Sequence, residues 1–81
     1  MTKSVFSDRY ERLRRLLVDA RKAKDLTQTE VARKLRRPQS FVSKYERGER
    51  RLDVVEFLDV TRVLALPPCD VFAELERGGR S

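Results

Sequence analysis

Apolar residues recur along this chain at intervals of three and four positions, in groups separated by polar turns. The first group shows the spacing most clearly, with Tyr10, Leu13, Leu17 and Ala20 on one side of a helix and charged residues between them. No segment alternates apolar and polar residues as a half-buried strand does, and no unit of the sequence repeats. The pattern therefore predicts an all-α fold built from short amphipathic helices.

Local signals set the ends of these helices. Three helices are preceded by a capping box, in which the residue before the helix and a glutamate three positions later satisfy each other's backbone N–H; the boxes start at Asp8, Thr27 and Asp53. Pro38 suits the first turn of another helix, which Gly48 ends, and Pro67 stops the helix that follows Asp53. We therefore expect helices at about residues 8–24, 28–35, 39–47, 54–65 and 69–76, with a flexible N-terminal arm at 1–7 and a frayed tail at 77–81.

The second and third expected helices are joined by so few residues that they must cross steeply. Ala32 would lie at the crossing, where a small side chain lets the two backbones approach. Apolar residues fill the angle between the helices: Val31, Leu35, Val42 and Tyr45. This arrangement is a helix-turn-helix, and it leaves an outward polar face on the third helix, formed by Gln39, Ser40, Ser43, Lys44 and Arg47.

Length and charge narrow the range of functions. The 81 residues suffice for one small domain, and no apolar run reaches the length of about 20 residues needed to span a membrane, so we expect a cytoplasmic protein. The net charge of +6 is concentrated before Leu52, and the segment that follows is acidic. A basic surface attracts polyanions, although a solvated face that keeps a small protein in solution would carry the same charge.

The residue types that carry catalysis and metal binding are scarce. The chain has no histidine, and Cys69 is its single cysteine, so an ordinary zinc site and an internal disulfide are excluded. It also lacks a glycine-rich phosphate loop and a nucleophile–base pair. We therefore expect no enzymatic activity, no cofactor and no metal, and we expect Cys69 to fill a small apolar space.

Four features follow one another at helix-turn-helix spacing: Thr27-Gln28 at the start of the second helix, Ala32 at the crossing, Val42 inside the third helix, and Glu46-Arg47-Gly48 at its end. With them, residues 27–72 resemble the helix-turn-helix domain of the Cro/lambda-repressor-like (XRE family) transcriptional regulators. The resemblance implies a compact five-helix domain of the lambda-repressor-like type. It also implies a bacterial or phage protein that associates with the nucleoid and acts as a dimer on an operator with two-fold symmetry.

The sequence departs from the family pattern mainly in the turn before the third helix. Arg36 stands where glycine is usual, so it requires a left-handed backbone at some cost in strain. Arg37 replaces an aliphatic residue, Pro38 replaces a capping hydroxyl, and Ala65 replaces the glycine that follows the fourth helix. We expect the fold to be kept, with a strained turn.

The resemblance also assigns roles in DNA binding. It implies base readout by the outward face of the third helix, through Gln39, Ser40, Ser43 and Lys44. Gln39 either pairs with adenine or contacts a phosphate without reading sequence, and Lys44 either donates to guanine or neutralises a phosphate. Phosphate contacts are expected from Gln28, Arg36, Arg37, Arg47, Arg50 and Arg51. Phe41 is expected to pack under the following loop rather than touch a thymine methyl.

The C-terminal third combines acidic and apolar residues. The fourth helix is expected to bury Val54, Phe57, Leu58, Thr61 and Leu64. The last helix carries more apolar surface than one short terminal helix buries by itself, and with the end of the fourth helix it forms the expected homodimer interface, through Val71, Phe72 and Leu75.

The sequence thus predicts a sequence-specific transcriptional regulator, a repressor that binds double-stranded DNA. It would bind an inverted repeat as a homodimer, with helix 39–47 in the major groove. The alternative is a small protein-interaction module, antitoxin-like or anti-activator, whose DNA binding is weak and non-specific. A steep fall of duplex affinity with salt would favour the first interpretation.

Overall fold

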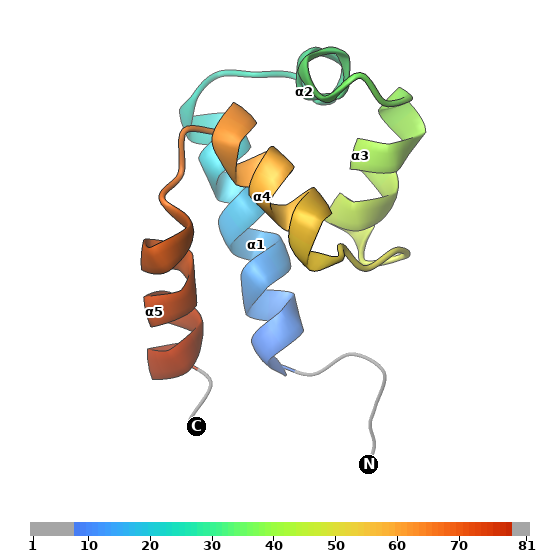
Figure 1. Ribbon diagram of the computed structural model, residues 1–81. Helices are drawn as coiled ribbons and strands as arrows, with labels where there is room; N and C mark the ends of the chain where they lie inside the picture. The colour runs from blue at the N-terminus through green and yellow to red at the C-terminus, as the bar shows by residue number, and fades with distance from the viewer. Residues whose placement is uncertain (1–7, 79–81) are drawn as a thin grey trace.

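The computed structural model describes residues 8–78, which form five α-helices and contain no strand (Figure 1). The helices are α1 (Asp8–Ala23), α2 (Gln28–Leu35), α3 (Gln39–Arg47), α4 (Val54–Val63) and α5 (Pro68–Gly78), so the predicted all-α, five-helix fold is confirmed. The expected arm, residues 1–7, and residues 79–81 of the expected tail lie outside the described part of the chain. The remaining tail residues, Arg77 and Gly78, belong to α5. None of these helices is long and apolar enough to cross a membrane.

Side-chain caps begin α2 and α4. At α2, Thr27 Oγ1 accepts from the Glu30 N–H (3.0 Å) and Glu30 Oε1 accepts from the Thr27 N–H (2.8 Å). At α4, the reciprocal bonds join Asp53 and Glu56, at 2.7 and 3.0 Å. Asp8 does not lie before its helix as an N-cap does, because it is already the first residue of α1.

Left-handed residues follow four of the helices. Asp25, two residues beyond the end of α1, has φ 61°. The residue after α2, Arg36, has φ 61°, and the residue after α3, Gly48, has φ 81°. Ala65, with φ 54°, lies two residues beyond Val63, and it stops α4 earlier than the sequence pattern predicts. A side chain in this region costs about 1–2 kcal/mol, so the strain expected at Arg36 is present, and Asp25 and Ala65 share it.

The core lies where all five helices meet. Its buried apolar residues are Leu17, Val31, Ala32, Phe41, Val42, Tyr45, Phe57, Val60, Leu64 and Val71. The predicted inward face of α4 is partly wrong, because Val54 and Leu58 are exposed and Val60 is buried instead. Positions 57, 60 and 64 also satisfy helical spacing, and the packing of α4 on α2 selects them.

The arrangement of the helices separates two faces of the molecule. Figure 1 shows α2 and α3 on one side of α1, and α5 beside α1 on the other. The short connection from α2 to α3 turns α3 across the end of α2, so the outward side of α3 points away from α5. A partner bound to α3 therefore leaves α5 accessible.

Candidate nucleic-acid interface

The helix-turn-helix of α2 and α3 presents a polar surface. Its inner side is closed by Val31, Ala32 and Val42, which are buried. The outward face of α3 carries the expected readout residues: Gln39, Ser40 and Lys44 are exposed and Ser43 is half-buried. Within residues 8–78, no acidic side chain pairs with Lys44 or Arg36, so both cations are available to an anionic partner.

A buried carboxylate on α3 organises one end of this surface. The Glu46 side chain is 6% exposed and accepts two bonds from Arg21 of α1, Nε to Oε2 at 2.7 Å and Nη2 to Oε1 at 3.1 Å. Arg21 also donates to the Leu26 carbonyl at 2.9 Å. Its hydrogen bond to Glu46 raises the pKa of the Arg21 guanidinium above its usual value. This pair ties α3 to α1 and to the loop before α2.

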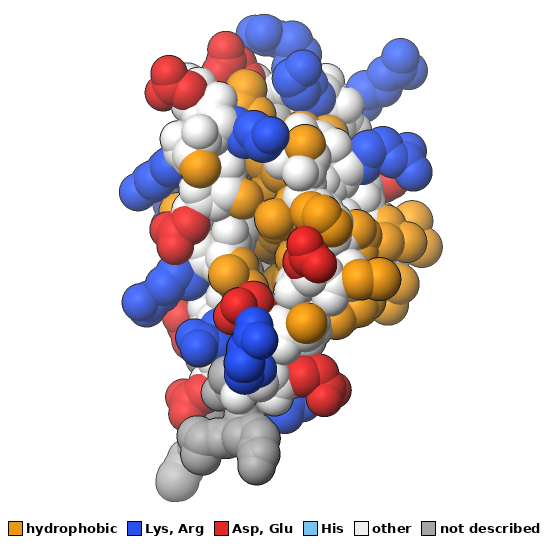
Figure 2. Space-filling view, turned by 90° about the vertical axis from the view of Figure 1, so that its left-hand side faces the viewer, with side chains coloured by type: hydrophobic (Ala, Val, Ile, Leu, Met, Phe, Trp, Pro, Cys, Tyr) orange, Lys and Arg blue, Asp and Glu red, His pale blue; other side chains and the backbone are white. Residues whose placement is uncertain are grey.

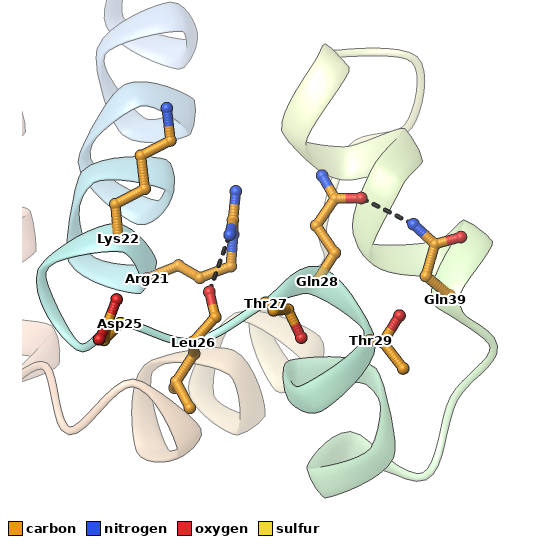
Figure 3. Close-up of a pocket in the computed structure, with 8 residues that line it drawn as sticks. All are labelled: Arg21, Lys22, Asp25, Leu26, Thr27, Gln28, Thr29 and Gln39. Atoms are coloured by element: carbon orange, nitrogen blue, oxygen red, sulfur yellow. Dashed lines mark hydrogen bonds between the residues drawn. The ribbon is translucent and has the colours of Figure 1, made fainter.

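The same carboxylate fixes Gln28, at the start of α2. Gln28 Nε2 donates to Glu46 Oε1 at 2.8 Å, and Gln28 Oε1 accepts from Gln39 Nε2 at 2.7 Å. Figure 3 shows the two glutamine side chains pointing toward one another from α2 and α3, beside an open hollow of about 480 Å³. A chain of polar bonds therefore runs from α1 to the first residue of the outward face.

The C-terminal end of α3, which includes Glu46, is also held by a second arginine of α1. Arg14 Nη1 donates to the Glu46 carbonyl, and Arg14 Nη2 pairs with Glu11 at 2.6 Å. Gly48 lies beside the Arg14 side chain, and a Cβ at Gly48 would be in van der Waals contact with Arg14 Cδ at 3.4 Å. The guanidinium thus sits at the C-terminal end of α3, where a positive charge stabilises the helix dipole.

A second cluster joins the turn before α3 to the loop after it. Glu56 accepts from Arg37 at 3.2 Å and from both terminal nitrogens of Arg50 at 2.8 and 2.9 Å. The bonds from Arg50, followed by the Asp53 N–H, lower the pKa of Glu56 to about 2. Both guanidiniums also lie over the ring of Phe41, with centroid distances of 4.4 Å for Arg37 and 4.8 Å for Arg50.

Phe41 packs as the sequence predicts, because it is buried and contacts Tyr45 edge to face with ring centroids 5.5 Å apart. Burial also raises the pKa of the Tyr45 hydroxyl well above its usual value. Of the remaining expected phosphate contacts, Arg47 pairs with Glu49 at 3.1 Å, and Arg51 lies over the Tyr10 ring at 4.3 Å.

The expected dimer residues have unequal exposure. Val71 is only 2% exposed in the core of its own chain, so its assignment to an interface is corrected, and Leu75 packs partly buried against the same core. Phe72 is 50% exposed and stacks on Phe57, with ring centroids 5.4 Å apart. Cys69, expected as a buried filler, is exposed on the first turn of α5.

An exposed apolar patch includes Phe72 and the start of α4. The sequence predicts that the end of this helix, not its start, contributes to the interface. The patch consists of Val54, Val55, Leu58 and Phe72, and Val54 is the most exposed of them at 71%. Figure 2 shows apolar side chains protruding together on this side of the molecule. We call these four residues the α4–α5 patch.

Sequence reasoning missed the two carboxylates that organise the surface. Glu46 follows Val42 by four positions, so helical spacing already placed it on the inward side of α3. Its partner Arg21 lies 25 positions away, and nothing local distinguishes it from the other arginines of α1. Glu56 was expected as a cap of α4, and its second role with Arg37 and Arg50 was not foreseen.

Comparisons with known proteins agree with this geometry. A family model described as a helix-turn-helix domain matches residues 12–75. An XRE-family like protein from Pseudomonas syringae pv. tomato str. DC3000 is 51% identical, with a TM-score of 0.82 over 85% of this chain and 84% of that one. The wild-type restriction-modification controller protein C.Esp1396I is 21% identical, with a TM-score of 0.78 over 89% and 95% of the two chains. A structure of that controller as a tetramer in complex with its natural 35 base-pair operator matches equally well, at 21% identity and a TM-score of 0.78 over the same shares. No protein with a curated description matches the chain.

Proposed function

Because the chain belongs to the XRE family of helix-turn-helix DNA-binding regulators, we propose that it binds a specific inverted repeat as a dimer and represses transcription there. The observation that carries the proposal is the outward face of α3, which is polar and held in place by a buried network from two neighbouring helices. In this proposal α3 enters the major groove, and the protein acts in the cytoplasm of a bacterium or of a phage-infected cell.

Gln39 is the residue best prepared for base readout. One of its N–H groups is bound by Gln28, which leaves the carbonyl oxygen and the second N–H for a ligand. These two atoms match the N6 donor and N7 acceptor of adenine in the major groove. Ser40, Ser43 and Lys44 would read neighbouring bases, with Lys44 either on guanine or on a phosphate.

Phosphate contacts surround this face in the proposal. Arg36 and Arg37 lie in the turn before α3, and Arg47, Arg50 and Arg51 lie at its end and beyond. Gln28 retains one N–H that its bond to Glu46 does not use, and this N–H suits a phosphate oxygen at the start of α2.

A second copy of the chain is the proposed occupant of the α4–α5 patch. The patch is apolar and belongs to α4 and α5 rather than to α3, so a two-fold pair could bury it while both α3 helices face one side of the duplex. The operator-bound tetramer of the controller protein, which has the same fold, supports assembly on DNA. The two α3 helices would then be about 34 Å apart, one turn of B-DNA.

Val55→Lys tests this assignment. A charge at a position that is 68% exposed should leave the folded monomer intact and prevent burial of the patch. Sedimentation should then show a monomer where the unmodified chain dimerises, and affinity should fall on the inverted repeat while binding to a half-site persists. An unchanged dimer would remove the patch from the interface.

The decisive test is selection of fragmented genomic DNA on the purified protein at physiological salt. Enrichment of a short inverted repeat supports the proposal, and a promoter reporter carrying that repeat then measures repression. Recovery of no sequence above background would favour a protein-interaction module instead. Gln39→Ala and Lys44→Ala should each lower affinity for the enriched site by about 1–3 kcal/mol, whereas an equal loss on random duplex would make them phosphate contacts.

A further inference from the structure

Two arginines compete for a single carboxylate beside the proposed DNA-binding face. Arg37 and Arg50 both donate to Glu56 Oε2, at 3.2 and 2.8 Å, and both cover the ring of Phe41. Asp53 and Asp59 lie nearby, but neither forms an ion pair with these arginines, so the two cations share the single carboxylate of Glu56. The two guanidiniums also repel each other, so the carboxylate cannot hold both equally well.

The bonds show which arginine is held more firmly. Arg50 uses two nitrogens on the two oxygens of Glu56 and also donates to the Arg51 carbonyl at 3.0 Å. Arg37 makes one bond to Glu56, and it is the longest of the three arginine bonds to that carboxylate. A bidentate guanidinium–carboxylate pair is both stronger and more directional than a single contact. The two side chains are nearly equally exposed, at 41% for Arg37 and 38% for Arg50, so solvent access does not distinguish them.

The Glu56 side chain is fixed in place and cannot move toward the DNA with either arginine. Its Oε1 accepts from the Asp53 N–H and its own N–H is bound by Asp53, so the side chain is fixed as the cap of α4. If Arg37 leaves, Arg50 still neutralises the carboxylate. If Arg50 leaves, a carboxylate with a side chain only 11% exposed keeps the Asp53 N–H and the single long bond from Arg37.

We propose that Arg37 is an exchangeable phosphate ligand, which leaves Glu56 for the DNA backbone, whereas Arg50 is a positioning residue that stays on Glu56. Arg37 lies two residues before the first turn of α3, where the backbone of a bound duplex would pass. Arg50 keeps the loop after α3 against Phe41 and α4. This division rests on the proposed function, and it withdraws Arg50 from the phosphate contacts.

Salt titration separates the two roles. The duplex enriched in the selection described above is bound over a series of salt concentrations, and the slope of log affinity against log salt is compared between variants. Arg37→Gln should lower the magnitude of the slope by about 0.9, the value for one phosphate contact, and leave the melting temperature close to that of the unmodified chain. Arg50→Gln should leave the slope unchanged and lower the melting temperature. Arg77→Gln removes the same charge from exposed α5 and should change neither quantity.

Conservative replacements sharpen the comparison. Arg37→Lys keeps a cation for the phosphate, so it should retain the slope. Arg50→Lys loses the planar fork that binds both oxygens of Glu56, so it should still melt lower. If Arg50→Gln is unfolded at the assay temperature, its positioning role is supported and the slope is taken from Arg50→Lys.

Two results would overturn the inference: an unchanged slope for Arg37→Gln, or a slope reduced by the Arg50 variants as much as by Arg37→Gln. Failure of the proposed function is distinct, because it would appear as an absence of any enriched duplex for the unmodified chain.

Discussion

Removing one partner of the Arg21–Glu46 pair should cost far more stability than removing both. Arg21→Met leaves a carboxylate that is 6% exposed with Gln28 as its remaining side-chain partner. Glu46→Leu leaves a guanidinium whose side chain is 13% exposed and bound only to the Leu26 carbonyl. An uncompensated buried charge costs about 3–5 kcal/mol, and because Arg21 can reach some solvent we expect about 3 kcal/mol for each single replacement.

The double variant removes both charges together. Its remaining losses are the partners of two neutral groups, the Gln28 N–H and the Leu26 carbonyl, at about 1 kcal/mol each, and the apolar packing that leucine and methionine add offsets part of this cost. We therefore expect the double variant to be about 1 kcal/mol less stable than the unmodified chain. The coupling energy of the cycle should exceed about 2 kcal/mol.

Urea denaturation followed by circular dichroism measures all four proteins, with an unchanged m-value as the control that the unfolding transition stays comparable. A loss of about 3 kcal/mol should lower the melting temperature of a domain of this size by about 12–24 °C. A coupling energy below about 0.5 kcal/mol would refute the reasoning, because it would mean that the two charges do not depend on each other.

Three further predictions concern the cap of α4 and the left-handed residues. The folded-state pKa of Glu56, about 2, lies below its usual 4.5, so the stability that its charge contributes is complete above pH 4.5 and is lost as the pH falls toward 2. Urea titrations between these pH values should show a smaller loss of stability for Glu56→Gln than for the unmodified chain. Equal losses of stability would contradict the assignment. Gly48→Ala should destabilise the domain by about 1–2 kcal/mol, because φ is 81° and a side chain is strained there. Thermal melting checks this, and an unchanged melting temperature would show that the backbone relaxes. Ala65→Gly should instead stabilise it by about 0.5–1 kcal/mol by relieving φ 54°, net of the greater chain entropy of glycine, and a lower melting temperature would contradict that balance.

The helices were predictable because their signals are local. The capping boxes of α2 and α4 involve residues three positions apart, and the structure contains both pairs of reciprocal bonds. The strained turn at Arg36 was also expected, because glycine is usual at that position in the family that the sequence resembles. At the start of α1 the same capping-box pattern gave a wrong prediction. Glu11, the fourth residue of the helix, can bind other partners, and it pairs with Arg14.

The partners of charged residues were not predictable in the same way. Arg37 and Glu56 lie 19 positions apart, and their contact depends on how α4 packs against the turn before α3. Helical spacing on α4 was satisfied both by Val54 and Leu58 and by Val60, so only the packing decided which face is buried. A pattern of cations shows that a surface is basic, but it does not show which cations are already bound within the protein.

The anchoring of α3 at both ends has a consequence for the duplex. Gln28 holds its first turn, and Arg14 and Arg21 hold its last, so the helix has little freedom to tilt toward an imperfect groove. Any mismatch in shape must then be absorbed by bending or twisting of the DNA. Base steps that deform cheaply should therefore be favoured even between the half-sites, where no side chain reaches, and the flexibility of the operator becomes part of what this rigid helix selects.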